Sequence, residues 1–248
     1  MTKVKNRAVI RRLAIRELKS NRKMNAVIIL SIILTCVLFT ALTSIGGSLI
    51  NGAQQETMRQ VGGDRMAGFK CVLPEDYEKV KADDATRDVV YRTIVGDAVN
   101  DEFKHISVEV NCAENMDAAQ ALFCAPETGR LPEGYDEIAV STLVLDELGL
   151  PYELGISVPI MLDIDGDISE HIFKLCGYWQ GERLAMAQEC WVSRDFAEKH
   201  APTPAESFYA QTYPGYAGYC MVDFNFRNSW NIEKKVDELT ARLYGDSD

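Results

Sequence analysis

The longest run without a charged side chain extends from Met24 to Gln55, and its centre, Val27 to Ile45, is almost wholly apolar. A helix rises ~1.5 Å per residue, so about 20 such residues cross the ~30 Å hydrocarbon core of a bilayer. This pattern predicts a transmembrane helix over residues 26–50. Helix-compatible residues follow it to about residue 61, and Gly62-Gly63 is expected to end the helix.

Charge divides the chain at the same place. Residues 1–25 hold nine basic side chains and one acid, Glu17, which gives this segment a net charge of +8. The whole chain carries −11, so the residues after 25 carry −19. Basic residues that flank a span stay in the cytoplasm. We therefore predict a cytoplasmic segment, 1–25, and an extracytoplasmic body, 62–248, held at the cell membrane. The acidic body would repel phosphate, which argues against nucleic acid as a partner.

Two other interpretations of the apolar run are weaker. A cleaved signal peptide has a shorter apolar region, and the small-residue cleavage site near Ser44-Ile45-Gly46 is poor. A buried helix of a soluble protein seldom contains so long an uncharged run. The basic segment also alternates cations with apolar residues, as a helix lying on anionic lipid does. The apolar residues are Val9, Ile10, Leu13, Ile15 and Leu18. Membrane lipid is therefore an expected partner, although simple anchoring explains the same charges.

Strand and helix patterns are intermixed along the body, which predicts an α+β fold with two small subdomains. Ser141 is suited to cap a helix, and Asp165-Gly166 is a strong two-residue hairpin turn. The last helix has an apolar face made by Ile232, Val236, Leu239 and Leu243. Strands are expected at 68–73, 89–95, 105–111, 137–140, 155–163, 171–179, 189–192 and 219–226, and helices at 74–84, 115–123, 142–148, 194–200 and 232–243.

No metal or cofactor site emerges from the sequence. Asp163-Ile164-Asp165-Gly166-Asp167 resembles the start of a calcium loop, but the glycine stands fourth rather than sixth, and Lys174 occupies the twelfth position. An EF-hand requires glutamate there. A hairpin turn explains the same residues. The histidines, His105, His171 and His200, are widely separated in the sequence and show no metal-type spacing.

The body has six cysteines, and two states remain open for them. An extracytoplasmic location permits disulfides, but four of the six lie beside apolar residues in expected strands, which also suits buried thiols. The six are Cys71, Cys112, Cys124, Cys176, Cys190 and Cys220. Cys36 lies within the span. Hydrolase and nucleotide-binding motifs are absent from the sequence, so we expect no catalytic residue and no enzymatic activity.

Two further features allow a functional and a structural interpretation. Arg130 could bind an anion or pair with Glu137, and we favour the pair. An aromatic group near the C-terminus could form a loop that contacts a peptide or lipid, or one that packs on the domain. It contains Phe208, Tyr209, Tyr213, Tyr216 and Tyr219.

The order of segments resembles a known family. Residues 14–42 resemble the cytoplasmic entry and first span of MacB/FtsX-type ABC transporter permeases. The body resembles the MacB-like extracytoplasmic core domain of those permeases. The matching segments, in order, are GRLP at 129–132, EIAVS at 137–141, LGL at 148–150, GISV at 155–158, FKLCGY at 173–178 and WVS at 191–193.

This resemblance implies a permease subunit that pairs with a cytoplasmic ABC ATPase and works as a homo- or heterodimer. Its outer domain would couple ATPase-driven movement to events outside, a mode called mechanotransmission, with export or release of an amphiphile such as a peptide or lipoprotein. No catalytic residue carries over, because the ATP chemistry belongs to the partner.

The family has three further spans after the core domain, and this sequence contains no second apolar stretch of that length. We therefore expect either the N-terminal part of a longer permease, which we favour, or a stand-alone remnant of one. The alternative is a membrane-anchored extracellular binding or sensor protein without an ATPase partner. An anchored hydrolase has the least support.

Overall fold

The computed structural model describes residues 7–202 and 220–245. Contacts divide the chain into two units, Met1–Glu56 and Thr57–Asp248, and we call the second unit the body. The aromatic group noted near the C-terminus lies outside the described residues.

Two helices precede the strands: α1 (Arg7–Ser20) and α2 (Arg22–Val61). The 40 residues of α2 form one helix, which confirms the expected helical extension to residue 61. By length and composition α2 can cross a membrane. Its hydroxyl groups bond back to the helix, as Thr35 Oγ1 does to the carbonyl of Ser31 at 2.8 Å. Gly62 has φ +77° and its amide donates to the carbonyl of Met58 at 2.9 Å, so the helix ends where a glycine can turn left-handed.

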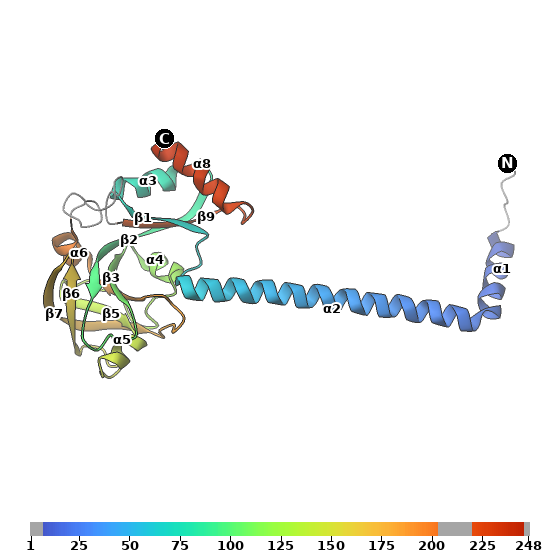
Figure 1. Ribbon diagram of the computed structural model, residues 1–248, viewed down its shortest axis with the longest axis horizontal. Helices are drawn as coiled ribbons and strands as arrows, with labels where there is room; N and C mark the ends of the chain where they lie inside the picture. The colour runs from blue at the N-terminus through green and yellow to red at the C-terminus, as the bar shows by residue number, and fades with distance from the viewer. Residues whose placement is uncertain (1–6, 203–219, 246–248) are drawn as a thin grey trace. The chain divides into compact units, whose positions relative to one another are not determined.

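The body is a mixed α/β domain, which confirms the α+β class (Figure 1). Its strands are β1 (Ala67–Val72), β2 (Thr86–Ala98), β3 (Val108–Ala113), β4 (Thr128–Gly129), β5 (Glu137–Ser141), β6 (Ser157–Ile164), β7 (Asp167–Trp179), β8 (Gln188–Val192) and β9 (Cys220–Phe226). Its helices are α3 (Pro74–Ala82), α4 (Met116–Ala121), α5 (Thr142–Glu147), α6 (Arg194–His200) and α8 (Ile232–Tyr244).

Six of the described strands close into a small barrel. The hydrogen-bonded order runs β2-β3-β8-β5-β7, and β6 pairs with both β7 and β2, so the path returns to its start. The pairs β3–β8 and β5–β7 are parallel, and the other neighbours are antiparallel. Closure leaves no free edge among these strands and encloses an apolar interior. Side chains from every barrel strand fill it, joined by Leu145 of α5 and Phe196 of α6.

A second apolar cluster lies where β1 and β9 extend the sheet beyond the barrel. Val222, Phe224 and Phe226 of β9 face α3 and α8, and Leu239 of α8 is fully buried among them. The helices α3 and α8 accordingly lie beside β1 and β9 in Figure 1. The body forms one compact unit by its contacts, so the two subdomains expected from sequence stay a prediction, and these two clusters are parts of that unit. They share one sheet because the long strand β2 contributes residues to both.

The observed strand bounds differ from those expected from the sequence mainly where hydrogen bonding between neighbouring strands sets the end of a strand. β7 begins at Asp167 rather than 171, because the hairpin with β6 stays paired up to Ile164–Asp167. Asp165 and Gly166 have φ +51° and +92°, as a tight two-residue hairpin turn requires. β3 begins at Val108 rather than 105. Ser141 caps α5 as expected, accepting from the amide of Val144.

Candidate functional site

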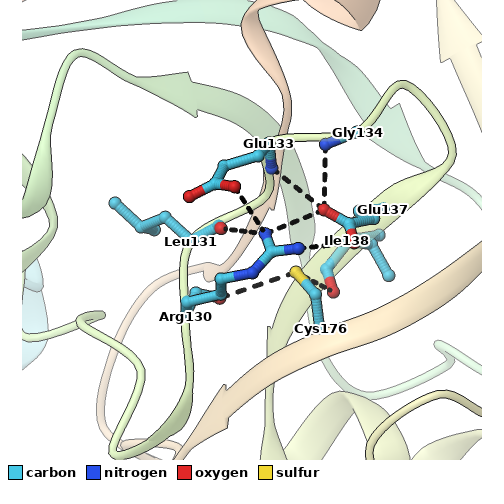
Figure 2. A network of polar contacts seen from close by, with 7 residues as sticks. All are labelled: Arg130, Leu131, Glu133, Gly134, Glu137, Ile138 and Cys176. Carbon is cyan, nitrogen blue, oxygen red and sulfur yellow. Dashed lines mark hydrogen bonds and ion pairs between the residues drawn. The ribbon is translucent and has the colours of Figure 1, made fainter.

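Arg130 and Glu137 form a closed ion pair at the entry to β5 (Figure 2). Both terminal guanidinium nitrogens of Arg130 donate to the Glu137 carboxylate at 2.8 Å. The backbone amides of Glu133 and Gly134 donate to the same carboxylate at 3.0 and 2.9 Å. The Arg130 side chain lowers the pKa of Glu137 to about 2, with further help from these amides. The predicted pair is confirmed. Since the guanidinium is already paired, this cluster holds the loop before β5 rather than forming an anion site.

The last turn of α2 forms an ion pair and a backbone hydrogen bond with the loop between β7 and β8. Arg59 Nε donates to Glu182 Oε2 at 2.6 Å, and this bond lowers the pKa of Glu182. The amide of Met186 donates to the carbonyl of Gln60 at 3.0 Å. Just beyond the helix, the amide of Asp64 donates to the carbonyl of Ala121 at 3.0 Å. These contacts belong to the body itself and connect the helix end to two of its loops.

A cleft of about 870 Å³ opens beside this helix end. It is lined by residues from the end of α2, from β1, β2, β3, β6, β8 and β9, and from the loops after α4 and β7. Its volume lies in the range of small-molecule sites. The cleft is therefore a candidate binding site in the body.

Two buried charged residues line the cleft, Arg92 and Glu189, and we call them its floor. Arg92 of β2, only 6% exposed, donates to Asp223 of β9 at 2.8 Å and lies 3.8 Å from Glu189 of β8. Asn111 donates to the other oxygen of Glu189 at 2.5 Å. Burial raises the pKa of both Glu189 and Asp223, and Arg92 opposes this rise. Among the described residues, Arg92 Nε and Asn111 Oδ1 are buried without a hydrogen-bond partner.

Two of the histidines that are distant in sequence meet in the structure. The rings of His171 on β7 and His200 on α6 have centroids 5.3 Å apart, and His200 stacks on Phe196 at 4.4 Å. Tyr135 Oη lies 2.6 Å from His200 Nε2. Burial is the main cause that lowers the pKa of each histidine. His105 is not part of this group. Within the described ranges, no set of three or more His, Cys, Asp or Glu side chains could hold a metal ion.

The structure has buried free thiols at some of the body's cysteines and partly buried free thiols at others. Cys190 is fully buried in β8 and Cys220 nearly so in β9, and both are free thiols. Cys112, Cys124 and Cys176 are free as well. Burial raises the pKa of the Cys112 and Cys176 thiols to about 11, so these sulfurs stay protonated and unreactive at neutral pH. Cys71 is buried at the end of β1.

Sequence analysis missed the cleft and its floor. Arg92, Glu189 and Asp223 lie on three different strands, and nothing in their spacing brings them together. One signal was present: each charge lies next to a buried or half-buried apolar residue of its strand, and a charge inside a buried strand needs a partner. That signal indicates a partnered charge, but it does not identify the partner.

The sequence matches no protein-family model and no curated protein. The solved structures to which the chain is similar, at low identity, include the following two. One is the extracellular domain of the noncanonic ABC-type transporter YknZ from Gram-positive bacteria, with 15% identity, a TM-score of 0.42, and coverage of 71% of this chain and 82% of that one. The other is the periplasmic region of MacB from Actinobacillus actinomycetemcomitans, with 12% identity, a TM-score of 0.42, and coverage of 71% and 76%.

Proposed function

We propose that this chain is the N-terminal part of an ABC transporter permease subunit. Its body couples ATPase-driven movement to the export or release of an amphiphilic substrate such as a peptide or lipoprotein. The observation that carries the proposal is α2, one helix from Arg22 to Val61. At ~1.5 Å per residue it is ~60 Å long, about twice the ~30 Å hydrocarbon core. A helix of this length can serve both as a span and as a stiff rod that leads into the body.

The contacts at the end of α2 support a mechanical role. The Arg59–Glu182 ion pair and the Gln60–Met186 hydrogen bond join the helix end to the loop after β7. Glu182 and Met186 also line the cleft. Displacement of the helix end would therefore act on a wall of the cleft. In this account the body changes the shape of its binding site when the helix moves.

The partners follow from the proposed orientation. The basic segment lies in the cytoplasm, where an ABC ATPase subunit acts on the permease, and two permease subunits form a homo- or heterodimer. The amphipathic helix α1 contacts membrane lipid. Its residues Val9, Ile10, Leu13 and Leu18 are all more than half exposed, which suits a helix whose apolar side chains enter a lipid interface.

Isolation from native membranes of the protein that contains this sequence, with a tag attached and any following residues retained, tests the proposal. An ATP-binding subunit should be recovered with the chain, and cells that express the untagged chain provide the control. Recovery of intact, folded chain with no ATP-binding subunit would overturn the permease assignment.

The cleft favours a second candidate function. A membrane-anchored binding or sensor protein needs a ligand site outside the membrane and no ATPase, and the body contains such a cleft without help from another subunit. Ligand binding by the chain, combined with no ATP-binding subunit in the isolation, would favour this alternative.

A further inference from the structure

Four carboxylates form a row across neighbouring strands of the barrel. Asp163 on β6 pairs in register with Asp97 on β2, and Asp97 pairs in turn with Glu109 on β3. Glu109 lies opposite Glu189 on β8. Paired residues on neighbouring strands place their side chains on the same face, with Cβ atoms ~5 Å apart. Like charges in such positions destabilise a sheet. Asp163 has a structural role as well, since its carboxylate accepts from the Gly166 amide of the hairpin turn at 2.8 Å.

The row is only partly neutralised. Glu189 has Arg92 and Asn111 as partners. Over the described residues, no lysine or arginine forms an ion pair with Asp97, Glu109 or Asp163. Burial, followed by the charges of Glu109 and Asp163, raises the pKa of Asp97. The row therefore repels itself in the protein without a ligand.

The whole row lines the cleft, and exposed apolar side chains line it too. We call Val61, Phe123 and Met186 the apolar wall. They are 69%, 47% and 81% exposed. Phe123 also has φ +56°, a left-handed conformation that is uncommon for an aromatic residue and tends to occur at functional positions.

The floor offers a second sign of a missing ligand. Arg92 is almost fully buried and lines the cleft, yet its Nε has no acceptor among the described residues. The Nε atom is shielded from solvent, so a ligand oxygen would satisfy this donor only after the surrounding side chains shift. The carboxylates are too dispersed to enclose a metal ion, because no described group of three or more such ligands could hold one. An organic cation matches the spacing better.

We propose that the cleft binds a cationic amphiphile, with its ammonium or guanidinium group on the carboxylate row and its apolar body against the apolar wall. Opposite charge on the ligand removes the repulsion within the row, which makes charge complementarity the source of selectivity. The inference rests on the proposed function, since it names the class of amphiphile that the permease would handle. It applies equally to the sensor alternative.

Calorimetric titration of the full-length chain in nanodiscs of zwitterionic lipid tests this site. The probes are octylammonium, octanol and octanoate, which share one chain and differ in charge, and empty nanodiscs provide the reference. Octylammonium should bind at a single saturable site at least about tenfold more tightly than octanol, and octanoate should not bind. Added salt should weaken octylammonium binding, because salt screens exposed charges.

Variants distinguish the effect of the carboxylate row on binding from the effect of the overall negative charge of the body. Asp97→Asn with Glu109→Gln should reduce octylammonium affinity by about tenfold or more while octanol is unaffected. Glu75→Gln with Glu78→Gln removes the same charge from exposed positions on α3 and should leave binding within about twofold of the native chain. Met186→Gln, at a highly exposed position, should weaken both octylammonium and octanol binding.

A stability measurement keeps the test decisive. Removal of repelling charges should leave the thermal midpoint of the Asp97→Asn, Glu109→Gln variant equal to or above that of the native chain. A lower midpoint would show that the row is structural, and equal binding of octylammonium by the native chain and this variant would also overturn the inference. These assays need no ATPase. Failure of octylammonium to bind would therefore count against this inference alone, and recovery of an ATP-binding subunit would still test the permease assignment separately.

Discussion

Replacing Glu137 by glutamine should destabilise the body by about 1–2 kcal/mol at neutral pH. The Arg130 guanidinium, followed by two backbone amides, lowers the pKa of Glu137 from 4.5 to about 2. One pKa unit corresponds to ~1.4 kcal/mol, so the full shift amounts to ~3 kcal/mol. The Arg130 side chain is 46% exposed, and solvent screening reduces this figure to about 1–2 kcal/mol.

The pH dependence has a definite sign. Because the pKa of Glu137 is lower in the folded state, its stabilisation is complete above pH 4.5 and is lost as pH falls towards 2. Denaturant unfolding of the full-length chain in nanodiscs, followed by the fluorescence of the buried Trp179 and Trp191, measures the difference. The gap between the native chain and Glu137→Gln should therefore be largest at pH 7 and shrink at acidic pH.

Glu133→Gln is the matched control for this prediction. Its carboxylate lies 3.9 Å from Arg130 and is 79% exposed, so its loss should cost less than about 0.5 kcal/mol. The reasoning would be refuted if Glu137→Gln were as stable as the native chain at pH 7, or if the gap stayed constant down to acidic pH.

Three further predictions concern stability. Burial lowers the pKa of His171 and His200, so the thermal midpoint should fall as pH drops below 6.5, and His171→Phe should flatten this dependence; a pH-independent midpoint contradicts the account. Gly62→Ala should cost about 1 kcal/mol in denaturant unfolding because φ is +77°, whereas Gly52→Ala within α2 should not destabilise. Ser141 and Ser193 cap α5 and α6, and Ser141 also donates to the buried Gln188 side chain. Ser141→Ala should therefore lower the free energy of unfolding by about 2 kcal/mol and Ser193→Ala by about 1 kcal/mol, and equal losses would argue against a contribution from the Ser141–Gln188 bond.

Local features of the fold could be predicted from the sequence because their causes lie within a few residues. The turn at Asp165-Gly166, the cap at Ser141 and the end of α2 at Gly62 each depend on backbone geometry that particular residues favour. The apolar face of α8 was also evident, because its side chains recur at the helical period.

Long-range features could not be predicted in this way. Barrel closure depends on two residue pairs, Asp97–Asp163 and Ala98–Leu162, whose members are more than 60 positions apart. The meeting of His171 with His200 depends on how α6 packs on β7, which no local pattern encodes. The carboxylate row shares this origin, since each acid is ordinary in its own strand and only the register brings the four together.

The central claim is that α2 transmits movement between an ATPase and the body. The most direct test inserts about two helical turns of Gly-Ser sequence at Asn51, with a helix-forming Ala-rich insertion of equal length as the control. ATPase activity and its response to substrate are then measured in the assembled transporter. The account predicts that the Gly-Ser insertion abolishes the response while the Ala-rich insertion retains it. Equal responses in both variants and in the native transporter would show that α2 is only an anchor.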